Sequence, residues 1–280
     1  MKYSGIGGQA VIEGIMMMKG EDYAVAVRRP DKEIEVKKDT YQSITKKAKI
    51  LQLPFVRGVF RFADSMIIGM RSLTYSASFF EDDEDAEPGK FEQFLDRVFG
   101  EKLESAIMAA VLVISFILAI GIFMLLPLGI ANLFKGVITS DHLMAVLEGV
   151  IRIAIFIIYI KLVSRMEDIR RTFMYHGAEH KCINCVEHGH PLTVKYVRES
   201  SKEHKRCGTS FILIVMVISI LMFMVIRVDT IWMRILSRII LVPVIAGISY
   251  EVLQCAGRSN SKFMDLVSRP GMWMQGLTTK

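Results

Sequence analysis

Two histidines and a glutamate in the middle of the chain are spaced for metal chemistry. The segment reads His176-Gly177-Ala178-Glu179-His180, a His-x-x-Glu-His pattern. If residues 165–184 form one helix, the two imidazoles lie one turn apart on the same face, with the carboxylate beside that face. Zinc hydrolases use these groups, two imidazoles to bind the metal and a carboxylate to take a proton from bound water. The spacing predicts zinc or another divalent metal at His176 and His180, with Glu179 as the catalytic base.

More ligand-type residues follow within the same loop. A catalytic zinc site needs a third protein ligand plus water, and a structural site needs a fourth protein ligand. Five of the six histidines and three of the four cysteines fall between positions 176 and 207, a clustering that core packing explains poorly. Cys207 is the most plausible third ligand of a catalytic site because it lies just before an apolar segment. A structural site would use two ligands from a larger set, which comprises Cys185, His188, His190, His204 and Cys207.

These residues leave two classes of function open. In the first, the protein is a zinc-dependent hydrolase that acts at a membrane on a lipid-linked or membrane peptide substrate. In the second, it is a non-catalytic membrane scaffold, assembly factor or carrier, and the His/Glu/Cys cluster is structural. The five-residue pattern is short enough to arise by accident, and polar residues near a membrane often serve only as interfacial anchors. Metal analysis of the purified protein tests the first class, because a protein without stoichiometric zinc or iron is not the predicted hydrolase.

The composition indicates an integral membrane protein. Of the 280 residues, 52% are hydrophobic, only 23% are charged and 18 are methionine, and the mean hydropathy is +0.37. Four segments are apolar and long enough for a helix to cross about 30 Å of hydrocarbon. They cover residues 105–134, 143–164, 210–226 and 235–250. Pro127 predicts a kink or tilt in the first, while Arg238 and Pro243 make the fourth the weakest candidate.

The distribution of Lys and Arg predicts the orientation. Residues 1–104 hold 16 of them, 165–209 hold nine and 252–280 hold four, against one in 134–142 and two in 227–234. By the positive-inside rule, both termini and the His/Cys-rich loop face the cytoplasm. There the cysteines are expected as thiols or metal ligands. The basic flanks also suit anionic lipid head groups, so the pI near 9.1 does not require nucleic acid.

The sequence before the first span predicts a cytoplasmic α+β portion. Residues 23–29 and 33–38 alternate around Pro30, which is typical of a β-hairpin that needs further partners. The segment 46–80 has helical spacing and is expected either along the membrane interface or on the soluble core. The acidic run 81–85 indicates a solvated linker into a helix at 91–103, with a cation-binding acidic site as the alternative. The glycine-rich opening, residues 5–14, lacks the pattern of a nucleotide loop and favours close backbone approach.

A pair of opposite charges lies inside the second span. Glu148 and Arg152 are four residues apart, and Arg238 enters the fourth span at a similar depth. Opposite charges at this spacing reduce one another's cost of burial. We expect an ion cluster that fastens these spans, with a transport or proton path as the alternative.

The predicted organisation is therefore that of a mainly α-helical membrane protein with about four transmembrane helices. Residues 1–104 form the N-terminal cytoplasmic region and 105–164 the first two spans. Residues 165–209 form the His/Cys-rich cytoplasmic loop, 210–251 the last two spans and 252–280 a cytoplasmic tail. The sequence leaves the oligomeric state open.

Several blocks of the chain together resemble the bacterial YqhQ family. They are Gly7-Gly8-Gln9-Ala10-Val11-Ile12-Glu13-Gly14, Val56-Arg57-Gly58-Val59, His176-Gly177-Ala178-Glu179-His180-Lys181, Arg206-Cys207-Gly208-Thr209 and the segment 241–251. The resemblance implies a bacterial cell-membrane protein from a family of uncharacterised members, sometimes labelled predicted metal-dependent enzymes. The family pattern usually has Thr where this chain has Cys182, so the resemblance covers His176, Glu179, His180, Cys185 and Cys207 better than a full Cys-x-x-Cys.

Overall fold

The computed structural model describes residues 3–80, 103–226, 230–259 and 261–280. The chain divides into two compact units, residues 1–80 together with 157–280, and residues 81–156. The first unit contains a β-sheet and the helices that surround the His/Cys-rich loop, and the second contains the first predicted span and most of the second. The acidic run 81–85 and nearly all of the helix predicted at 91–103 lie outside the described residues.

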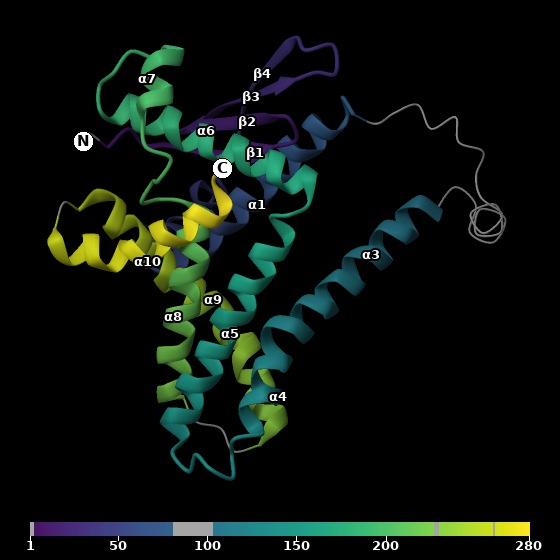
Figure 1. The fold of residues 1–280 in the computed structure, drawn as a ribbon, viewed down its shortest axis with the longest axis vertical. Coiled ribbons are helices and arrows are strands. Elements are labelled where there is room, and N and C mark those ends of the chain that lie inside the picture. The colour runs from purple at the N-terminus through teal and green to yellow at the C-terminus, as the bar shows by residue number, and fades with distance from the viewer. Residues whose placement is uncertain (1–2, 81–102, 227–229, 260) are drawn as a thin grey trace. The chain divides into compact units, whose positions relative to one another are not determined.

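The N-terminal part folds into a four-stranded antiparallel sheet with the order β1-β2-β3-β4 (Figure 1). The strands are β1 (Ile6–Val11), β2 (Gly14–Lys19), β3 (Asp22–Arg28) and β4 (Ile34–Thr40). The predicted hairpin is confirmed as β3 and β4, which pair from Arg28↔Ile34 to Asp22↔Thr40. The partners that it required are β1 and β2, which the sequence analysis did not identify as strands.

Helix α1 (Val56–Ala77) covers one face of the sheet. Val11, Met16, Val25 and Val27 alternate with outward residues and form a buried core with Ile68 of α1. Two short 3-10 turns, Ile44–Lys46 and Lys49–Gln52, precede this helix. The described residues show α1 packed on the sheet and on α9, and a position of this segment along the membrane interface stays a prediction.

Helix α6 (Glu167–Glu187) contacts β1 and β2, and Figure 1 shows it running across the sheet. Its bounds confirm the helix predicted from the His-x-x-Glu-His spacing. A Cβ added to Gly8 of β1 would clash with Glu179 of α6, and a Cβ added to Gly69 of α1 would clash with Gln9 of β1. Because successive strand residues point to opposite faces, α6 and α1 lie on opposite faces of β1.

The remaining helices of this unit are α7 (Val194–Glu199), α8 (Gly208–Val225), α9 (Ile231–Arg258) and α10 (Lys262–Thr278). Helix α10 contacts α8, α9 and α6, so the C-terminal segment lies beside the His/Cys-rich loop. Helix α1 also crosses α9, where Gly58 faces the backbone of Gly247 and Arg57 forms an ion pair with Glu251 at 2.5 Å.

Four described helical segments are long and apolar enough to cross a membrane: Val113–Asn132, Asp141–Val163, Gly208–Val225 and Leu236–Arg258. They agree with the predicted spans, although the fourth continues beyond residue 250. In the first, α3 (Leu103–Ile120) passes through a π-helical turn, Gly121–Leu125, into α4 (Leu126–Asn132). The turn ends two residues before Pro127, the residue expected to disturb this span. Proline has no N–H to donate to the helical ladder, so the hydrogen-bond pattern changes in the preceding turn.

The second span, α5 (Asp141–Val163), contains the predicted pair of charges. Arg152 Nη2 lies 2.6 Å from Glu148 Oε1. Arg238 belongs to the other unit, where its guanidinium stands 5.0 Å from the centre of the Phe223 ring. The described contacts therefore establish the pair, and the three-residue cluster stays a prediction.

Candidate metal centre

Three side chains converge between α6 and α8. The ligand atoms of His176, His180 and Cys207 all lie within 4.8 Å of one another. His176 Nε2 is 3.1 Å from Cys207 Sγ, and the centres of the two imidazole rings are 4.4 Å apart. With Zn–N near 2.0 Å and Zn–S near 2.3 Å, the ligand atoms of a tetrahedral zinc ion are about 3.3 to 3.8 Å apart. The three residues therefore fit one metal ion after small side-chain shifts.

Hydrogen bonds from the other ring nitrogens set the orientation of both imidazoles. His176 Nδ1 lies 2.9 Å from the carbonyl oxygen of Thr278, and His180 Nδ1 lies 2.7 Å from that of Lys202. A carbonyl oxygen only accepts hydrogen bonds, so both Nδ1 atoms carry the proton. In a neutral imidazole this leaves the lone pair on Nε2, free to bind a metal. Two backbone carbonyls thus prepare two histidines for the same role.

Cys207 is positioned by the start of α8. It is the N-cap of that helix, and its sulfur accepts a hydrogen bond from the backbone N–H of Thr209 at 3.4 Å, with the Thr209 hydroxyl 3.1 Å away. Donors aimed at the sulfur suit a metal-bound thiolate. Cys207 is 4% exposed and His180 is 1% exposed. The candidate centre is therefore largely shielded from solvent.

Glu179 lies beside the three ligand residues, under the exposed backbone of Gly8. Its Oε2 is 3.8 Å from His180 Nε2, and the residue is 4% exposed. Burial raises the pKa of Glu179 to about 7, although the nearby His176 opposes this effect. Within the described part of the chain, no protein donor forms a hydrogen bond with its carboxylate. The side chain therefore has accepting capacity for a water molecule.

Two other predicted ligands lie elsewhere. Cys185 Sγ approaches the carbonyl oxygens of His190 at 3.8 Å and Pro191 at 3.5 Å. His204 Nε2 lies 3.4 Å from Glu187 Oε2, and its ring centre is 5.8 Å from that of His180. Burial, with a smaller contribution from the nearby Arg206, lowers the pKa of His204 to about 4. Neither side chain belongs to the group of three.

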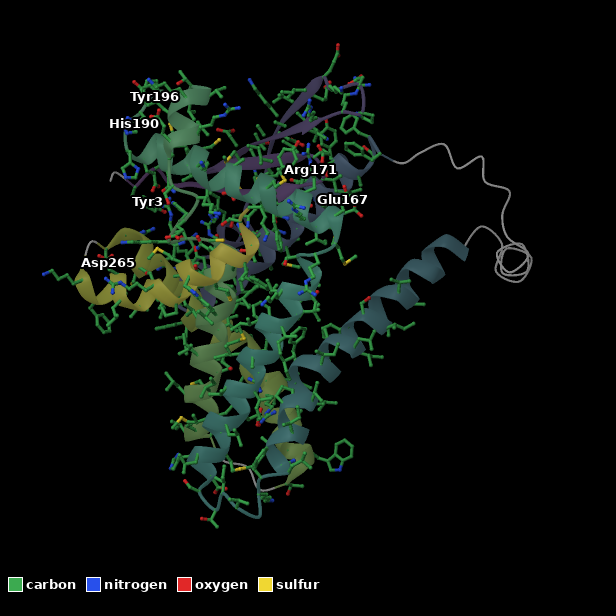
Figure 2. The ribbon with its side chains drawn as sticks, in the orientation of Figure 1. Tyr3, Glu167, Arg171, His190, Tyr196 and Asp265 are labelled. Atoms are coloured by element: carbon green, nitrogen blue, oxygen red, sulfur yellow. The ribbon has the colours of Figure 1, made fainter. Side chains whose placement is uncertain are left out.

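The other histidines of the loop are engaged in local contacts. His188 Nδ1 lies 2.8 Å from the Asn184 carbonyl oxygen. The His190 ring stacks on Tyr196 of α7 with 5.4 Å between the ring centres, and Figure 2 labels both side chains. Cys182 is half-buried, and burial raises the pKa of its thiol. Among the described residues, Cys182, Cys185, Cys207 and Cys255 form no disulfide.

A buried polar network, which sequence reasoning missed, holds the loop before α8 in place. Glu187 accepts hydrogen bonds from the backbone N–H and hydroxyl of Ser4, at 3.0 and 2.8 Å, and from the Arg206 guanidinium. Burial raises the pKa of Glu187, but these bonds outweigh it and lower the pKa overall. The Gln275 side chain of α10 donates a hydrogen bond to the backbone carbonyl oxygen of His204 at 2.7 Å and accepts one from the backbone N–H of His204 at 2.9 Å. The partners are far apart in sequence, so no local spacing indicates them.

The comparisons with known proteins agree with the resemblance noted in the sequence. A family model described as "Protein of unknown function (DUF1385)" matches residues 53–280. The "Uncharacterized protein YqhQ" of Bacillus subtilis (strain 168) is 33% identical over 275 residues, which cover 98% of this chain and 86% of that protein. No solved structure matches the chain. With so much of its length aligned, the chain belongs to the YqhQ-like family.

Proposed function

We propose that the protein is a metal-dependent hydrolase of the membrane surface, with zinc bound by His176, His180 and Cys207 and Glu179 as the catalytic base. The observation that carries this proposal is the arrangement of the two imidazoles. Both Nδ1 atoms lie against backbone carbonyls, and a cysteine sulfur lies within reach of both rings. A histidine that serves only as a core hydrogen-bonding group has no need of a second histidine and a thiol at its remaining nitrogen.

The chain's own groups divide the chemistry of hydrolysis. Zinc, when bound at such a site, polarises the scissile group and lowers the pKa of water. Glu179 takes a proton from the attacking water while the oxygen of that water bonds to the substrate carbonyl carbon. Glu179 then delivers the proton to the leaving nitrogen or oxygen as the bond between this atom and the carbonyl carbon breaks. The Thr278 and Lys202 carbonyls keep both imidazoles in the ligating tautomer.

The position of the site along the chain supports a membrane-associated substrate. All four site residues lie between the second span, which ends at Val163, and the third, which begins at Gly208. The Lys and Arg distribution favours the cytoplasmic side of the bacterial cell membrane for this connection and for both termini. A lipid-linked compound or a membrane peptide is the substrate class that would reach it there.

A second candidate function is favoured by the burial of the ligands. His180 and Cys207 are almost inaccessible, and they join α6 to the start of α8. In this alternative a metal ties the cytoplasmic part of a non-catalytic scaffold, assembly factor or carrier. Structural zinc sites contribute directly to folding stability, so removal of the metal would then unfold this part.

Metal analysis of the purified full-length protein tests the proposal first. We expect about one zinc ion per chain, with loss of the metal in His180→Ala and Cys207→Ser. The exposed Cys255 supplies the matched thiol control, because Cys255→Ser should retain the metal. Purified protein that holds no stoichiometric metal, and takes up none from zinc-containing buffer, would eliminate the metal-dependent hydrolase.

Glu179→Gln separates the two candidates. A catalytic role predicts a variant that keeps zinc and its thermal unfolding temperature but loses hydrolysis of fluorescein-labelled casein or of a p-nitrophenyl ester. The structural alternative predicts zinc-loaded wild-type protein that hydrolyses neither probe. It also predicts that chelation of the metal lowers the unfolding temperature.

A further inference from the structure

The first strand of the sheet has an open edge. In the order β1-β2-β3-β4, β1 pairs with β2 on one side only. A two-residue turn joins Val11 to Gly14, which makes 11↔14 a hydrogen-bonded pair, and the alternation of an antiparallel ladder then assigns the pairs 9↔16 and 7↔18 to the same type. The N–H and C=O groups of residues 6, 8 and 10 therefore point away from β2.

The ends of this edge are closed by side chains, but its middle is not. The N–H of Ile6 donates to Ser4 Oγ at 3.1 Å, and the N–H of Ile12, just after the strand, donates to Ser76 Oγ at 3.1 Å. Between them, the outward N–H and C=O groups of Gly8 and Ala10 form no hydrogen bond with any residue that the structure describes. Gly7 and Gly8 are exposed.

The open stretch lies directly beside the proposed catalytic base. A Cβ built on Gly8 would be 2.6 Å from Glu179 Oε1, which places the carboxylate against this part of the strand. Helix α6, which carries His176 and His180, packs along β1. A molecule bound along the edge at Gly8 and Ala10 would therefore pass close to Glu179.

From these observations we infer that β1 binds an extended polypeptide segment as an added strand and so presents its peptide bonds to Glu179. This inference rests on the proposed function and names its substrate class. Unpaired main-chain donors and acceptors along a strand are matched by another backbone in the extended conformation, and addition of a strand to a sheet edge is a common mode of peptide recognition. A lipid head group has no such repeating pattern.

The test uses the full-length Glu179→Gln protein in phosphatidylcholine nanodiscs, loaded with zinc. The probe is a fluorescein-labelled peptide of alternating Val and Lys, and its binding is measured by fluorescence anisotropy. Ala10→Pro removes an outward N–H and adds a ring at the open edge, without touching the ladder to β2. We expect it to weaken binding at least about tenfold.

The opposite edge of the sheet supplies the matched control. By the same alternation, Val36 of β4 has an outward N–H, and its side chain is 51% exposed. Val36→Pro should leave peptide binding within about twofold of the parent, because it changes the edge far from α6. Equal loss in both variants, or no saturable binding to the parent protein, would overturn the inference.

Modified peptides test the same contact without altering the protein. Two N-methyl groups on residues i and i+2 block only one edge of an extended peptide, whereas two on residues i and i+1 block both. Strand addition predicts that the first peptide binds like the unmethylated one and that the second loses at least about tenfold. Equal affinity of the two methylated peptides would refute strand addition, even if Ala10→Pro fails to fold.

The outcomes separate this inference from the hydrolase itself. Peptide binding that follows the predicted pattern in a protein without metal or hydrolysis would leave strand addition standing and overturn the enzyme. Zinc-dependent hydrolysis of the p-nitrophenyl ester, with no binding of any peptide, would support the enzyme and overturn the assignment of β1.

Discussion

Replacing Gly8 by alanine should damage the candidate site, although it alters neither a ligand nor the base. The added Cβ would lie 2.6 Å from Oε1, 2.7 Å from Cγ and 2.8 Å from Cδ of Glu179. Ordinary van der Waals contact begins at 3.4 Å, so the carboxylate must move by about 0.8 Å or the strand must retreat from α6. Gly7 is the matched control, because a Cβ there meets nothing within 4 Å.

The two substitutions should differ in sign as well as size. Overpacking of this kind costs about 1 to 3 kcal/mol of folding free energy, and a misplacement near 1 Å in a catalytic group costs about a hundredfold in rate. Gly7→Ala should be neutral or stabilising by about 0.5 kcal/mol, because alanine reduces the freedom of the unfolded chain. Neither glycine has a positive φ, so backbone strain does not complicate the comparison.

The assay compares thermal unfolding, zinc content and casein hydrolysis of both variants with those of the wild type. We expect Gly8→Ala to lower the unfolding temperature by a few degrees and to lose most of the hydrolysis, while Gly7→Ala matches the wild type. If Gly8→Ala behaves like Gly7→Ala in stability and rate, then Glu179 does not lie where this reasoning needs it. Loss of hydrolysis in both variants would instead indicate that hydrolysis depends on the glycine backbone at both positions and not on the contact between Gly8 and Glu179.

Three further predictions concern contacts away from the metal centre. The hydrogen bond from Arg171 is the main cause that lowers the pKa of Glu13 from 4.5. The stability that the Glu13 carboxylate contributes is therefore present above pH 4.5 and is lost as the pH falls through its folded-state pKa. Glu13→Gln should flatten the acid side of a plot of unfolding temperature against pH. Buried Asp64 accepts three hydrogen bonds, from two hydroxyls and one backbone N–H, so Asp64→Ala should cost about 3 to 5 kcal/mol in chemical denaturation, and a loss below about 1 kcal/mol would contradict the network. A Cβ on Gly58 would lie 2.9 Å from the backbone of Gly247, so Gly58→Val should lower the unfolding temperature. The control is Gly129→Val, because a Cβ on Gly129 meets nothing within 4 Å, whereas Gly20 has a positive φ that would strain any side chain.

The parts of the fold that follow from local patterns were predictable. The spacing of His176 and His180 indicated α6, uninterrupted apolar runs indicated the spans, and alternation around Pro30 indicated β3 and β4. Strands β1 and β2 escaped detection because Gly7 and Gly8 interrupt the first pattern and consecutive methionines obscure the second. Their strand identity depends on pairing with β3 and on cover from α1 and α6, which no short window of sequence records.

The candidate site was predictable in its histidines and only partly in its remaining residues. Cys207 was singled out because it directly precedes a span, and the structure brings it to the two histidines. Cys185 and His204 were equally good ligands by residue type, but one faces carbonyls of its own loop and the other pairs with Glu187. Residue type and clustering do not determine the direction in which a side chain points.

The carbonyls that orient the imidazoles come from segments remote from α6, and this bears on how the site works. Thr278 lies at the end of α10 and Lys202 in the loop before α8, so both histidines acquire their ligating tautomer only when these segments are docked. A metal that binds the docked state alone would stabilise it by mass action. Structural and catalytic roles of the same ion are therefore compatible, because the assembly that aligns the ligands also places Glu179 under Gly8.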